Sequence, residues 1–134
     1  LVGPAMFDRF ILPDTVECCR HVERIIYHLD GPGALQHLDR LLAIDALHCV
    51  QWVQGAGAPL PSAWLDLLRR IQAGGKTVQV TYGGAHGGRA DFKTEIDALC
   101  GALDPDRLFI VATVESMEKA EFIVRYAREV TRAR

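Results

Sequence analysis

A histidine and an aspartate two residues apart are the side chains of this sequence best suited to chemistry. His28 and Asp30 stand at the end of the apolar run Ile25–Leu29 and just before the turn Gly31-Pro32-Gly33. Period two along a strand sends both side chains to the same face, so an imidazole and a carboxylate can converge on one cation or substrate. A helical segment follows at once, and such βα junctions are where α/β proteins build binding and catalytic sites.

Four apolar, β-type runs predict the strands that position these groups. They are Ile25–Leu29, Cys49–Val53, Thr77–Tyr82 and Leu108–Thr113. A segment with helical periodicity follows each run, and a further helix from about Asp14 to Val22 precedes the first. The sequence therefore predicts an α/β fold in which four βα repeats follow an N-terminal helix, with residues 1–134 as a single unit.

The helices that follow the strands can be placed individually. The helix after the first strand runs from Ala34 to Leu42. The second is capped by Ser62 and ends at Gly74-Gly75, and the third opens at Asp91 and stops at Asp104-Pro105. Ser116 opens the last helix, whose predicted inward stripe is Met117, Ala120, Val124 and Ala127.

Four parallel βα units are half of the eight that close a TIM barrel. Half a barrel leaves two unpaired strand edges and one uncovered sheet face, which we expect to carry Ile26, Val50, Val78 and Ile110. Three accounts follow: the chain is a fragment of a larger barrel domain, it dimerises to complete eight strands, or it forms an open α/β sheet that binds a small ligand.

Other polar residues lie near predicted strand ends. Gln51, Trp52 and Gln54 could stack on and hydrogen-bond a planar ligand, although a Trp in this place also serves packing. Tyr82 and His86 flank a glycine-rich loop that could close over substrate, and both are candidate acid or base groups.

Composition narrows the class of protein. The chain has 134 residues, 49% hydrophobic, with a formal net charge of −2. Without a basic patch, a long apolar run or a signal segment, we expect neither nucleic acid nor membrane as a partner, and a cytoplasmic location. The four cysteines form no CxxC pair, which favours reduced thiols.

Three segments carry a resemblance to a known family. They are Tyr27–Ala34 (YHLDGPGA), Val50–Gly57 (VQWVQGAG) and Leu108–Thr113 (LFIVAT). In this order and spacing they look like the C-terminal half of the uroporphyrinogen decarboxylase superfamily, in its decarboxylase-like or cobalamin-dependent methyltransferase-like branch. The resemblance implies a (β/α)₈ barrel of which this chain supplies the latter part.

The resemblance also implies a candidate metal site. The methyltransferases of the superfamily hold zinc with a His-x-Cys pair and a later Cys, and the metal activates a thiol for methyl transfer. This chain has His28-Leu29-Asp30 at the first place and Glu115 near the second, so a His, Asp and Glu set would bind zinc or another divalent ion. The alternative is that His28 and Asp30 only shape the loop by hydrogen bonding.

By this resemblance the chain is part of a barrel enzyme. We expect a metal-assisted methyltransferase that moves a methyl group between a corrinoid, carried on a partner protein, and a thiol. Besides His28 and Asp30, its small-molecule substrate would contact Gly31, Gly33 and the residues around Gln51. The alternatives are a cofactor-free porphyrinogen decarboxylase, whose arginine-rich substrate-binding segment is absent here, and a non-catalytic half-barrel that binds a small ligand.

Overall fold

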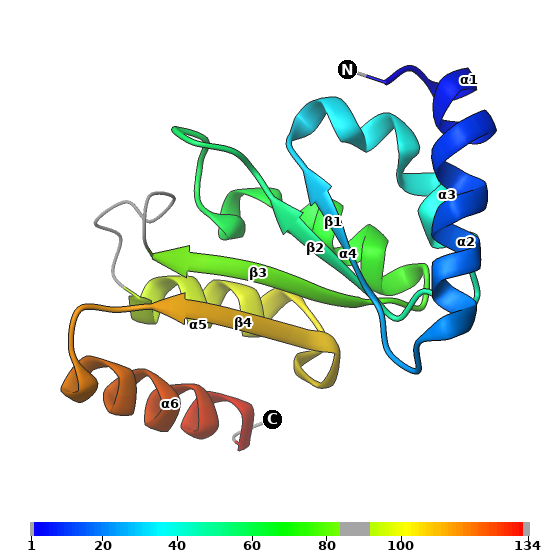
Figure 1. The fold of residues 1–134 in the computed structure, drawn as a ribbon. Coiled ribbons are helices and arrows are strands. Elements are labelled where there is room, and N and C mark those ends of the chain that lie inside the picture. The colour runs from blue at the N-terminus through cyan, green and yellow to red at the C-terminus, as the bar shows by residue number, and fades with distance from the viewer. Residues whose placement is uncertain (1, 84–91, 133–134) are drawn as a thin grey trace.

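The four predicted strands form one parallel sheet. The structure, a computed structural model, describes residues 2–83 and 92–132. Its strands are β1 (Ile26–Asp30), β2 (Cys49–Val53), β3 (Thr77–Gly83) and β4 (Leu108–Thr113). They pair in the order β1-β2-β3-β4, all parallel (Figure 1). The predicted strands are confirmed to within one residue at each end.

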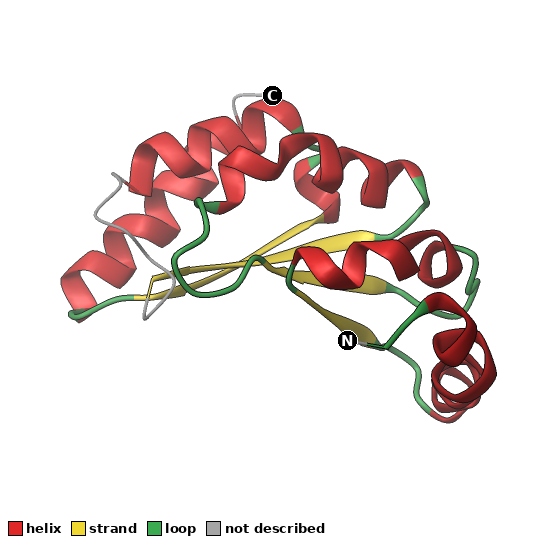
Figure 2. Cartoon of the chain, turned by 90° about the horizontal axis from the view of Figure 1, so that it is seen from above, coloured by secondary structure: helices red, strands yellow, loops and turns green. Residues whose placement is uncertain are grey.

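Helices connect the strands in the predicted order. The described helical segments are α1 (Pro4–Met6), η1 (Phe7–Ile11), α2 (Leu12–His21), η2 (Pro32–His37), α3 (Leu38–Leu42), η3 (Pro61–Trp64), α4 (Leu65–Ala73), α5 (Phe92–Ala102), η5 (Pro105–Arg107) and α6 (Met117–Arg132). The connection between two parallel strands of one sheet is right-handed in nearly all proteins. Repeating that step in sequential strand order places the helices along one side of the sheet (Figure 2).

The sheet therefore has two unlike faces. The register aligns Leu29 with Trp52, Val80 and Ile110, and these side chains pack into the core beneath the helices. The adjacent row in the same register is His28, Gln51, Gln79 and Phe109, and it points to the side without helices. We call this side, made by the alternate residues of β1–β4 that include His28 and Asp30, the open face.

The predicted composition of the open face was wrong in part. Val50, Val78 and Ile110 pack on the helix side, in the main core, whereas Ile26 is 47% exposed and lies in the same alternation as His28. β2 and β4 carry apolar residues at both alternate positions, so hydrophobicity alone did not distinguish their faces. Glutamine at matching positions of β2 and β3 marks the open side instead.

The inward stripe predicted for α6 was also wrong in part. Ile123 is buried, and Ala127 and Val130 pack against the same cluster, whereas Met117 is 75% and Val124 50% exposed. The helix carries two apolar stripes about a quarter turn apart, and only one of them meets α5 and β4. The other stripe remains uncovered by the described residues.

The N-terminal helical region begins at Pro4 and not near Asp14 as predicted. The end signals predicted for the later helices hold in the described residues, with one exception. Gly75 has a φ of 80° after α4, and the Ser116 hydroxyl oxygen accepts a 3.2 Å hydrogen bond from the Lys119 backbone N–H at the start of α6. Ser62 does not cap its own helix. Its hydroxyl and backbone N–H both donate to the buried Glu95 carboxylate on α5, so it joins two helices. Asp91, the predicted start of α5, lies outside the described residues.

Among the helices that the structure describes, none combines the length and apolar character required to cross a bilayer.

Two isoleucines test the difference between the faces. Replacing the fully buried Ile71 of α4 with alanine should lower the free energy of unfolding by about 2–5 kcal/mol, because it leaves a cavity in the core. The same change at Ile26 on the open face should cost less than about 1 kcal/mol. Urea denaturation followed by circular dichroism measures both, and equal losses would contradict the assigned orientation.

Candidate functional site

The loop after β1 is held against the end of β2. The Gly31 backbone N–H donates a 2.8 Å hydrogen bond to the Val53 carbonyl, which extends the ladder by one residue. Gly31 then turns the chain with a φ of 75°, a left-handed conformation that favours glycine. His28 and Asp30 consequently lie at the carboxyl end of a well-tied strand, both exposed on the open face.

A cross-strand hydrogen bond orients the His28 ring. Its Nδ1 lies 2.6 Å from Oε1 of Gln51, the residue directly opposite on β2. An amide oxygen only accepts hydrogen bonds, so Nδ1 carries the proton in this arrangement. In a neutral imidazole Nε2 then keeps its lone pair and is the atom available to a ligand.

Polar side chains extend from His28 across three strands. Gln79 of β3 continues the row beyond Gln51, and Thr81 lies in the next open-face row, which begins with Asp30. On β4 the corresponding residues are Phe109 and Val111, so the polar character ends at the third strand. Sequence reasoning did not identify Gln79 or Thr81, although the repeated glutamine at matching strand positions was a usable signal.

Glu115 does not join His28 and Asp30 within this chain. It follows β4, at the opposite edge of the sheet from β1, and three strand spacings amount to roughly 14 Å in a flat sheet. Both Glu115 carboxylate oxygens accept from the Lys119 ammonium group, at 2.8 and 3.2 Å, and this contact lowers the pKa of Glu115. In the described part of the chain, no three His, Cys, Asp or Glu side chains form a group that could hold a metal ion.

The aromatic candidates are in the core. Trp52 is fully buried on the helix side and contacts Trp64 edge-on, with ring centroids 5.0 Å apart, which supports the packing alternative. Tyr82 is also buried and lies edge-on to Phe92 at 4.6 Å. His86, the other candidate acid or base group, falls outside the described residues.

The remaining candidates around the strand ends have mixed placements. Gln54 is buried just after β2, and its amide nitrogen has no hydrogen-bond partner among the residues that the structure describes. Gly33 offers its carbonyl to the Gln36 side chain at 2.9 Å, so it stabilises the loop after β1. The structure thus brings together His28, Asp30 and Gln51, and it separates them from Trp52 and Glu115.

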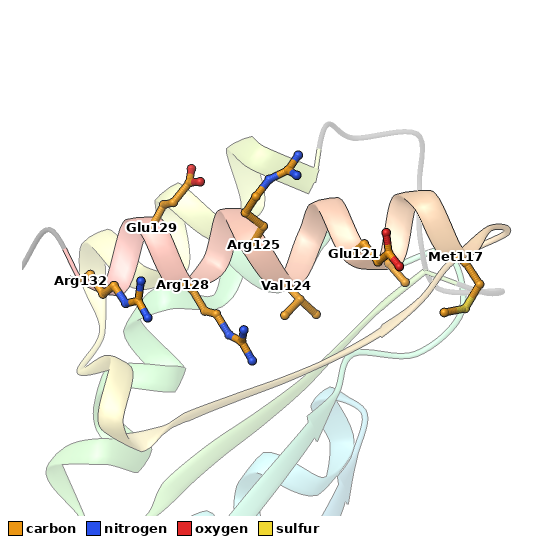
Figure 3. Close-up of a pocket in the computed structure, with 8 residues that line it drawn as sticks. Met117, Glu121, Val124, Arg125, Arg128, Glu129 and Arg132 are labelled. Carbon is orange, nitrogen blue, oxygen red and sulfur yellow. The ribbon is translucent and has the colours of Figure 1, made fainter.

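A separate hollow of about 610 Å³ lies along α6. Met117 and Val124 line its N-terminal half, and Arg125, Arg128 and Arg132 line the part toward the C-terminal end of the helix (Figure 3). Because α6 follows β4, the hollow is at the far edge of the sheet from His28. It marks the uncovered apolar stripe of α6 and does not belong to the polar site.

No family model, curated protein or solved structure matches the chain in comparisons with known proteins.

The cysteines should differ sharply in reactivity. Cys18 is exposed, whereas Cys19, Cys49 and Cys100 are buried, and burial raises the pKa of the Cys49 thiol from 9.0 to about 11. At pH 8 we expect one of the four thiols to react rapidly with a chromogenic disulfide reagent and the others only on unfolding. The rapid phase should vanish in Cys18→Ser, and its persistence would contradict the assigned burial.

Proposed function

We propose that this chain forms half of a (β/α)₈-type barrel and supplies a small-molecule site at the carboxyl ends of β1–β3. The observation that carries the proposal is the His28–Gln51 hydrogen bond on the open face, beside Asp30. Such a polar group on the side of a parallel sheet that a closed barrel would turn inward is in the position where barrel proteins bind ligands.

The reaction we propose is the metal-assisted methyl transfer that the family resemblance implies. His28 Nε2 and the Asp30 carboxylate fit a divalent ion as two donors on one face, whereas Glu115 does not reach them in this structure. Further ligands would come from the residues that complete the barrel. The metal would supply Lewis acidity to a thiol, and the methyl donor would be a corrinoid on a partner protein.

A non-catalytic binding module is the second candidate. It is favoured by the pairing of Glu115 with Lys119, which leaves only His28 and Asp30 of the predicted metal set on the open face. In that case the face holds a small ligand by hydrogen bonds alone. Porphyrinogen decarboxylation is a further alternative, which would need groups that bind substrate carboxylates.

Completion of the barrel is supported by apolar groups at both ends of the sheet. Ile26 on β1 and Phe109 on β4 are each about half exposed on the open face, and β1 and β4 are the two edge strands. The uncovered stripe of α6, with Met117 and Val124, lies where the next βα unit of a barrel would pack. The missing half would be either the remainder of a longer chain or a second copy.

Metal content tests the proposed reaction. Protein purified without chelator should retain about one divalent ion per chain, measured by inductively coupled plasma mass spectrometry. The ion should be lost in His28→Ala, because that change removes the donor nitrogen. The matched control is His21→Ala, since His21 is an exposed histidine on α2. A metal-free wild type would contradict the enzyme proposal, as would equal loss in both variants.

Solution mass tests the proposed half-barrel. This chain of 14.8 kDa should self-associate, because the described residues leave two strand edges uncovered and expose Ile26 and Phe109 on the open face. Phe109→Lys should shift light-scattering masses toward the monomer by placing a charge on that surface. Asp66→Lys, on the exposed side of α4, should not. A wild type that is monomeric at all concentrations would contradict the proposal.

A further inference from the structure

We infer that the open face around His28 selects a cationic or hydrogen-bond-donating group of the ligand. Gln51 is the positioning residue, because it fixes the His28 tautomer that leaves Nε2 as an acceptor. The inference rests on the proposed binding site and names the class of ligand for it. It follows from the identity of the atoms that the face presents, and it holds whether or not a reaction follows binding.

The first step is the proton on the His28 ring. The 2.6 Å contact joins Nδ1 to the carbonyl oxygen of Gln51, which can only accept. The ring of free histidine prefers the other tautomer, with the proton on Nε2. Gln51 therefore reverses the intrinsic preference of the ring and leaves Nε2 as an acceptor.

The second step is what holds Gln51 in place. It lies on β2, paired on one side with His28 of β1 and on the other with Gln79 of β3. Neighbouring strands in a sheet are about 4.8 Å apart, so its side chain stands between two others of the same row. Gln51 is half-buried and Gln79 is buried, which limits the conformations available to the amide. The amide is thus a well-supported partner for the ring.

The third step is the neighbouring carboxylate. Asp30 lies on the same face two positions along β1, roughly 7 Å from His28 along the strand. An ionised carboxylate can also only accept hydrogen bonds, so both groups at the end of β1 would bind hydrogen-bond donors. A ligand amine or guanidinium group would satisfy both at once. A ligand carboxylate would meet a like charge at Asp30 and no donor on the neutral ring.

The tautomer can be measured directly in the chain without any ligand. In ¹⁵N-labelled, chelator-treated protein at a pH where the ring is neutral, long-range ¹H–¹⁵N spectra should show a protonated Nδ1 and an unprotonated Nε2 for His28. Gln51→Leu, which keeps the size but removes the acceptor, should move the ring toward the Nε2–H form. A wild-type ring protonated on Nε2 would overturn the inference.

Gln79→Leu is the matched control, since it removes the other glutamine of the row. It should leave the His28 tautomer unchanged. If both leucine variants shift the ring equally, the effect is general repacking of the open face, and a positioning role for Gln51 is excluded.

Two probes of similar size and opposite charge test ligand selection. Ethylammonium should shift the His28 Nε2 resonance in a saturable manner, and propionate should not. Gln51→Leu should weaken the ethylammonium response several-fold. A stronger response to propionate would overturn the inference. Failure of the proposed enzyme function would instead appear as absence of retained metal, with the tautomer and the probe responses unaltered.

Discussion

One constraint shapes this molecule: each strand pairs in parallel with the next strand in the chain, and every crossover has the same hand. Repeated at each of the three crossovers, this puts the helices on one side of the sheet and leaves on the other side a polar group on β1–β3, with Ile26 and Phe109 exposed on the two edge strands. The same arrangement brings the carboxyl ends of all strands to one edge of the sheet. Both the candidate site and the uncovered surfaces are consequences of this topology.

The main hydrophobic core lies on the side of the sheet that the helices cover. Leu38, Leu68 and Val80 are fully buried in one continuous cluster that links α3, α4 and the sheet. At the opposite end of the strands from the site, the buried Lys76 ammonium group donates to the Ile44 carbonyl at 2.6 Å, so even this charge has a partner. His28 and Asp30, exposed on the open face, take no part in this cluster.

The sequence was sufficient to predict what depends on local pattern. Apolar runs located the strands, and period two along β1 anticipated that His28 and Asp30 share a face. The orientation of β2 and β4 was less accessible, because their apolar residues occupy both alternate positions and the side on which the helices pack decides which of them are buried. Glu115 shows a further limit: a lysine four residues away on the next helical turn competes for its carboxylate, and only the folded chain reveals which contact forms.

The bond from the Gly31 N–H to the Val53 carbonyl bears on how the site can move. It ties the loop that follows β1 to the end of β2, while the His28–Gln51 contact ties the same two strands two residues earlier along β2. The carboxyl ends of β1 and β2, which carry His28 and Gln51, are therefore joined by one backbone and one side-chain hydrogen bond. In the proposed site, a ligand would therefore meet an imidazole whose orientation is already set by its neighbouring strand before binding.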